Sequence, residues 1–109
     1  MKRGTMTVIK INVKRYDTEY LEIDGSLESF QKLVGGYIEP CAPVQLREQG
    51  IELLANEEGL LKGLAPNENL YPFFLVGDLV AVGVAEDEFT SLTVDQIKYL
   101  VRWLSELDS

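Results

Sequence analysis

The chain has 109 residues, one cysteine, no histidine and a formal net charge of −8. This length predicts a single domain over residues 1–109 that buries its own core without a disulfide or a metal. No apolar run approaches the ~20 residues that a membrane helix needs, and no signal peptide is evident, so we expect a cytoplasmic protein without a membrane partner. The lack of histidine excludes Ser–His and Cys–His nucleophile systems and His-ligated zinc. We therefore expect no enzyme activity, no metal site and no cofactor.

The negative charge lies almost entirely after residue 15. The first fifteen residues contain five bases and no acid, so the other five of the ten bases face all eighteen acids, a net charge of −13. Such a body repels phosphates, because nucleic acid binding needs clustered Lys and Arg. We expect no direct contact with nucleic acid.

The N-terminal part predicts a flexible leader over residues 1–5, followed by a β-hairpin. Residues 7–13 alternate between apolar and polar side chains, which is typical of a half-buried strand, and residues 20–24 predict a second strand. A basic first strand beside an acidic second strand favours antiparallel pairing, since opposite charges then face each other.

A helix over residues 26–35 is predicted next. Ser26 can cap its first turn by accepting a backbone N–H, and an apolar stripe follows at helical spacing. That stripe consists of Leu27, Phe30, Leu33 and Val34. Gly35 or Gly36 provides the left-handed residue that ends many helices, although paired glycines can also expose backbone to a ligand.

The chain then predicts an extended segment at residues 37–39. Because Pro40 and Pro43 cannot donate to a ladder, the segment around them either lies at a sheet edge or leaves the sheet. Cys41 is interpreted as a small packed residue rather than a reactive thiol. Residues 51–55 predict a short strand, Asn56 to Gly59 a hairpin turn, and residues 60–62 the returning strand.

The second half predicts an irregular loop, a buried strand and a closing helix. Residues 63–69 form the longest irregular stretch, and residues 79–85 predict a central strand that is covered on both faces. Residues 86–88 are interpreted as a solvated acidic turn. Thr93 and Gln96 form a capping box that opens a helix over residues 93–107.

The apolar arc of this last helix is wider than one buried face requires. Its core stripe is predicted to contain Val94, Ile97, Leu100, Val101, Leu104 and Leu107. Trp103 lies beside the stripe and Tyr99 beyond it. Either strands or a loop wrap the helix, or Tyr99 and Trp103 belong to a surface for a partner or for self-association.

Together these elements predict an α+β fold, a mixed and mainly antiparallel sheet with two helices packed on it. Five short segments also occur in a fixed order: Val-Gly-Gly-Tyr-Ile-Glu at 34–39, Asn-Glu-Glu-Gly at 56–59, Leu-Ala-Pro-Asn at 64–67, Gly-Asp at 77–78 and Phe-Thr-Ser-Leu-Thr at 89–93. This series resembles a family of small proteins of unknown function that are found in phages, plasmids and other mobile elements of bacteria. The resemblance spans nearly the whole chain and implies a bacterial or phage source, but it implies no catalytic residue. It also implies a basic residue after Asn67, where this chain has Glu68.

Three functions are compatible with these observations. The leading hypothesis is a non-catalytic accessory or inhibitory protein of a mobile element that binds a host or phage protein. The alternatives are a protein that binds a small polar ligand, such as a nucleotide or metabolite, and a structural module that self-associates through Tyr99 and Trp103. The candidate binding residues are Gly35, Gly36, Tyr37, Glu39, Asn56, Glu58, Asn67, Tyr99 and Trp103.

Overall fold

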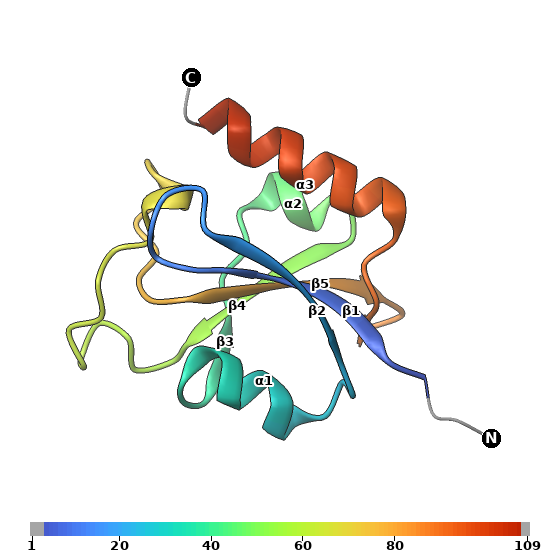
Figure 1. Cartoon of the computed structure of the whole chain (residues 1–109), viewed down its shortest axis with the longest axis horizontal. Helices are drawn as coiled ribbons and strands as arrows, with labels where there is room; N and C mark the ends of the chain where they lie inside the picture. Colours follow the sequence, from blue (N-terminus) through green and yellow to red (C-terminus); the bar gives the residue numbers. More distant parts are fainter. Residues whose placement is uncertain (1–3, 108–109) are drawn as a thin grey trace.

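An antiparallel sheet of six strands lies between helices on both of its faces (Figure 1). The computed structural model describes residues 4–107, so residues 1–3 of the predicted leader lie outside the described part. The strands are β1 (Met6–Ile11), β2 (Thr18–Ile23), β3 (Ile38–Pro40), β4 (Ile51–Asn56), β5 (Leu79–Ala85) and β6 (Glu88–Thr90). The helices are α1 (Leu27–Val34), α2 (Val44–Arg47), α3 (Val94–Leu107) and the 3₁₀ turn η1 (Glu68–Leu70). The predicted α+β fold is confirmed.

The sheet has the order β2-β1-β5-β4-β3, and β6 pairs with the end of β5. Helix α1 covers one face, while α2 and α3 cover the other (Figure 1). The predicted central strand is confirmed, because β5 is third in this order and its first five residues are buried. Its side chains alternate between the two cores, with Val80 and Val82 toward α1 and Leu79 and Ala81 toward α3.

The N-terminal hairpin has the predicted antiparallel pairing, with Lys10 of β1 opposite Glu19 of β2. The prediction that the first strand is half-buried is wrong. Ile9 and Ile11 lie in the core beneath α3, but Val8 is also fully buried in the core beneath α1. The alternation in the sequence could not show this, because a helix on each face of the sheet buries apolar side chains at both odd- and even-numbered positions of the strand.

Helix α1 begins and ends as the sequence predicts. The Ser26 hydroxyl accepts from the Ser29 amide at 3.1 Å. Gly35 has the left-handed φ of 83° and its N–H donates to the carbonyl of Gln31. The apolar stripe is only partly buried, because Phe30 and Val34 face the core whereas Leu27 is exposed.

The hairpin predicted at residues 56–59 is wrong. Residues 57–63 form successive local turns, with the Lys62 amide donating to the carbonyl of Glu58 and the Gly63 amide to that of Leu60. The chain then crosses the end of the sheet and pairs with β4 only at β5. The backbone hydrogen bonds within these turns replace those that a returning strand would make. Leu61, which was expected in that strand, is 89% exposed.

The acidic turn at residues 86–88 is confirmed as the connection between β5 and β6. Glu86 and Asp87 both have positive φ values, 53° and 65°. This combination fits a two-residue hairpin turn, which brings Ala85 opposite Glu88. Helix α2 was not predicted, because four residues are too few to show a period.

Helix α3 opens with the predicted capping box, in which the Thr93 amide donates to Gln96 and the Gln96 amide donates to the Thr93 hydroxyl. The buried stripe is rotated from the predicted one. Trp103 is only 9% exposed and stacks on Phe73 with ring centroids 5.7 Å apart, whereas Val94 and Val101 are 67% and 50% exposed. The interpretation that a loop wraps the helix therefore holds for Trp103, which is not available as a surface anchor. Tyr99 is partly buried against the same core.

Replacing Trp103 tests this packing. Trp103→Ala should lower the free energy of unfolding by about 3–5 kcal/mol, because a large buried side chain leaves a cavity beside Phe73. Trp103→Phe is the matched control and should lower the free energy of unfolding by less, since an aromatic ring still stacks on Phe73. Thermal and urea unfolding measure both variants. An unchanged midpoint for Trp103→Ala would contradict the buried position.

Candidate functional site

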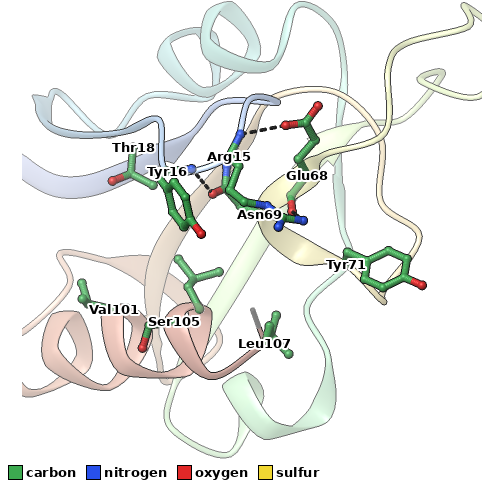
Figure 2. A pocket seen from close by; sticks show the side chains of 10 residues that line it. Arg15, Tyr16, Thr18, Glu68, Asn69, Tyr71, Val101, Ser105 and Leu107 are labelled. Carbon is green, nitrogen blue, oxygen red and sulfur yellow. Dashed lines mark hydrogen bonds between the residues drawn. The ribbon is translucent and has the colours of Figure 1, made fainter. Parts of the chain in front are cut away.

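A groove lies between the β1–β2 loop, the η1 turn and the C-terminal half of α3 (Figure 2). It has a volume of about 510 Å³. Its lining combines apolar, aromatic and polar side chains: Arg15, Tyr16, Thr18, Glu68, Asn69, Tyr71, Val101, Leu104, Ser105 and Leu107. We call this hollow the α3 groove.

The floor of the α3 groove is apolar because of the helical spacing of α3. Val101, Leu104 and Leu107 follow one another at intervals of three residues and so lie on the same side of the helix. The ring of Tyr16 points toward the helix from the opposite side (Figure 2). The groove therefore has an apolar floor that faces the ring of Tyr16.

Asn69 holds the β1–β2 loop over this floor. Its side-chain N–H₂ donates to the carbonyls of Asn12 and Lys14, both at 2.8 Å. Its side-chain oxygen accepts from the Tyr16 amide at 2.7 Å (Figure 2). Tyr16 has a φ of 69°, which is rare for a bulky residue and persists only where neighbouring groups enforce it. The backbone at Tyr16, from which this ring projects, is thus held in place by Asn69.

Glu68 and Arg15 complete the polar side of the α3 groove. The Glu68 carboxylate accepts from the Arg15 amide at 3.0 Å, and the Arg15 guanidinium lies 3.4 Å from the Glu68 carbonyl. Glu68 occupies the position after Asn67, where the family resemblance implies a basic residue. Its carboxylate therefore anchors the β1–β2 loop. A carboxylate in this place disfavours an anionic ligand.

Asn67 supports the groove from below without lining it. It is 2% exposed, and its N–H₂ donates to the carbonyls of Ile11 at 2.9 Å and Gly77 at 3.0 Å. Its side-chain oxygen accepts from the Asn69 amide at 3.0 Å. All three bonds stay within the protein, so Asn67 positions Asn69 and is not a ligand contact.

Residues 6–105 match the family described as a domain of unknown function, DUF3846. The chain belongs to the DUF3846 family. The matched span contains every residue that lines the α3 groove except Leu107. Neither a curated protein nor a solved structure matches the chain.

The diglycine residues of this DUF3846 chain lie at a different place. Gly36, Tyr37 and Glu58 line a shallow depression of about 310 Å³ together with Gln31 and Lys62. No residue lines both this depression and the α3 groove. The diglycine turn and the loop over residues 63–69 therefore contribute to two separate hollows.

Asn56 and Gly35 have structural roles beside this depression. Asn56 is buried, donates to the Val34 carbonyl at 3.3 Å and accepts from the Glu58 amide at 2.8 Å. A Cβ on Gly36 would lie 2.9 Å from the Asn56 amide nitrogen, so this glycine allows the side chain to approach. Gly35 ends α1, which confirms its interpretation as a C-cap.

Two remaining candidates, Glu39 and Tyr99, stand apart from both hollows. Glu39 is exposed on β3, which is an edge strand as the prolines predict. Neither Tyr99 nor Trp103 lines the α3 groove. Sequence reasoning missed the groove because its walls come from three distant segments. The one local signal was the pair Asn67 and Asn69 in an irregular loop, since Asn commonly bonds to nearby backbone.

Cys41 is partly buried against the core beneath α3 and has the character of a packed residue. Burial first, and then the charges of Glu52 and Glu39, raise the pKa of its thiol to about 12. The thiolate that a nucleophile needs is therefore scarce at neutral pH. Glu52 holds the adjoining segment, accepting from the Ala42 amide at 2.8 Å and from the Arg47 guanidinium at 3.2 Å.

Across residues 4–107, no three or more acidic or cysteine side chains converge in a way that could hold a metal ion. Within the same residues, no helix has both the length and the apolar character to cross a membrane.

Removing the Asn69 side chain should loosen the α3 groove. Asn69→Ala deletes three hydrogen bonds and should destabilise the fold by about 2–3 kcal/mol at roughly 1 kcal/mol per bond. The amide of Tyr16 should also exchange with solvent faster, because it loses its acceptor. Asn12→Ala is the control, since that exposed side chain donates only to Glu19. If Asn69→Ala unfolds at the same urea concentration as the parent, the loop is held by other contacts.

Proposed function

We propose that the chain is a non-catalytic binding protein of a phage or other mobile element, and that it acts on a host protein in the bacterial cytoplasm. The observation that carries this proposal is the α3 groove, with its apolar floor and the ring of Tyr16 on a backbone that Asn69 holds. The five ordered segments that resemble proteins of mobile elements support the source. The groove supports binding, because apolar clefts with a few oriented polar groups are the usual form of recognition sites.

The surroundings of the α3 groove favour recognition of a protein. Tyr16 and Tyr71 stand at its rim and are 73% and 70% exposed. Aromatic side chains are enriched at protein interfaces, where a few anchors provide most of the binding energy. The acidic body of the chain favours encounter with a basic partner.

Catalysis has less support than binding at this site. The charged side chains of the lining, Arg15 and Glu68, are engaged in holding the loop. The only thiol of the chain is buried elsewhere, and its pKa is raised to about 12. Self-association through Tyr99 and Trp103 also has less support, because Trp103 is buried within the protomer.

A charge placed in the floor tests the proposal. Val101→Lys should reduce capture of a host protein from bacterial lysate about tenfold or more, because losing one anchor contact is worth at least ~1.4 kcal/mol. Val94→Lys is the matched control, since Val94 is exposed on the same helix but does not line the groove. Quantitative mass spectrometry of the captured proteins, with thermal unfolding of both variants, gives the comparison. Equal capture by both variants would place the binding surface elsewhere.

A small-ligand function is the second candidate, and the volume of the groove favours it. About 510 Å³ lies within the range of roughly 300–1,000 Å³ that is typical of small-molecule sites. A ligand with a ring and polar substituents could place the ring between Tyr16 and the floor. Its polar groups would face Arg15 and Asn69.

This candidate predicts a rise in the thermal midpoint with a nucleotide or metabolite panel. A ligand at 100 times its Kd stabilises the folded state by about 2.7 kcal/mol, because it binds only that state. Val101→Lys should abolish the rise and Val94→Lys should preserve it. If no compound raises the thermal midpoint of either the parent or Val94→Lys, the binding of a partner protein is the function that the groove supports.

A further inference from the structure

The two edges of the sheet differ in how well they are protected. Strand β3 has three residues, one of which is Pro40, so it offers little backbone for pairing. Strand β2 has six residues and contains no Pro, Gly, Lys or Arg. Among residues 4–107, no strand pairs with the outer side of β2. An edge of this kind is a template for another strand.

The hydrogen bonds of the hairpin show which groups of β2 face outward. Antiparallel residue pairs alternate between bonded and non-bonded types. The Asn12 amide donates to the Asp17 carbonyl, so the next pair, Ile11 and Thr18, is of the non-bonded type. The register then makes Tyr20 and Glu22 non-bonded as well. Thr18, Tyr20 and Glu22 therefore direct their N–H and C=O groups away from β1.

The opposite side of β1 agrees with this assignment. Thr7, the partner of Glu22, donates its amide to the Ser91 hydroxyl at 2.8 Å and accepts at its carbonyl from the Leu92 amide at 3.0 Å. The Ile11 carbonyl likewise accepts from Asn67. Both residues thus bond away from β2, as the alternation requires.

The outward edge of β2 adjoins the α3 groove. Thr18, Tyr20 and Glu22 lie opposite Ile11, Ile9 and Thr7, respectively, so their side chains are on the face of the sheet that carries α3. Thr18 itself lines the groove together with Val101 (Figure 2). Tyr20 is 59% exposed, so this part of the face is accessible. A strand added beside β2 would place every second side chain on this face, and the one beside Thr18 would reach the groove.

We propose that an extended, basic segment of a partner protein adds to the edge of β2 as a further antiparallel or parallel strand and inserts an apolar side chain into the α3 groove. This inference rests on the proposed function and specifies the partner's mode of docking. Main-chain hydrogen bonds to Thr18, Tyr20 and Glu22 provide affinity, and the groove provides specificity.

Charge determines the chemistry of the segment. Residues 16–31 contain five acids and no base: Asp17, Glu19, Glu22, Asp24 and Glu28. Hydrogen bonds from Thr7 first and then Thr5 lower the pKa of Glu22, and this group stays ionised at neutral pH. When every second residue of the added strand is apolar and shares the face of Thr18, the residues between them share the opposite face with Glu19. Lys or Arg at those positions would lie beside the Glu19 carboxylate. A second copy of the chain is disfavoured, because it has the same acidic edge and a net charge of −8.

The test uses the heptapeptide acetyl-Lys-Val-Lys-Val-Lys-Val-Lys-amide as a probe of an alternating basic segment. At saturation, hydrogen exchange at the amides of Thr18, Tyr20 and Glu22 should slow about tenfold or more, because these N–H groups gain acceptors. Val101 methyl resonances should shift in the same titration. The same peptide with Glu in place of Lys should bind at least about tenfold more weakly, since like charges then face each other.

Two substitutions at one position isolate the backbone. Tyr20→Pro removes one outward N–H without breaking the β1–β2 ladder, and proline is tolerated at a strand edge. It should weaken peptide binding about tenfold, whereas Tyr20→Ala keeps the N–H and should weaken binding less. Thermal unfolding of both variants confirms that each is folded.

Several results would overturn strand addition. One is binding that shifts Val101 without protecting the Thr18, Tyr20 and Glu22 amides. Another is no binding of the peptide, and a third is a dimer in light scattering that Tyr20→Pro converts to a monomer, which would make the occupant a second copy. If Tyr20→Pro still captures the host protein that Val101→Lys loses, strand addition fails while the proposed function stands. If Val101→Lys captures the host protein as well as the parent does, the proposed function itself fails.

Discussion

The hydrogen bonds of two asparagine side chains hold the segments that form the α3 groove, for which we propose a role in recognition. Asn67 connects the end of β1 to the loop before β5, and Asn69 connects η1 to the β1–β2 loop. Buried polar groups are costly unless they are paired, and a fully paired network holds one arrangement in preference to others. Every buried side-chain nitrogen and oxygen in the described part of the chain has such a partner. The shape of the α3 groove follows from this pairing.

The same constraint places two kinds of recognition surface side by side. The loop that Asn69 holds is the connection between β1 and β2, so the wall of the groove leads directly into the free edge of the sheet. A strand edge recognises any extended backbone, whereas an apolar cleft discriminates between side chains. Together they could select one segment of one partner. Neither surface requires a reactive group, which agrees with a chain that has no histidine and whose one thiol has a raised pKa.

Helices on both faces explain why the sheet has one vulnerable edge. Strands β1, β4 and β5 bury apolar side chains on both faces of the sheet. The outer strands are covered less. Strand β3 is protected by its shortness and its proline, while β2 is protected only by charge. Acidic side chains on an edge prevent pairing between identical chains but leave it open to a basic segment.

The sequence determined the local features of this protein, because their causes lie within a few residues. Ser26 and Gly35 specify the limits of α1, Thr93 and Gln96 open α3, and the apolar run at residues 79–85 specifies a central strand. Tertiary structure decided the rest. Val8 is buried because α1 covers a second face, and Trp103 is buried because Phe73 arrives from a distant loop. The α3 groove combines residues 15–18, 68–71 and 101–107, and no local pattern records that long-range hydrogen bonds bring these segments together.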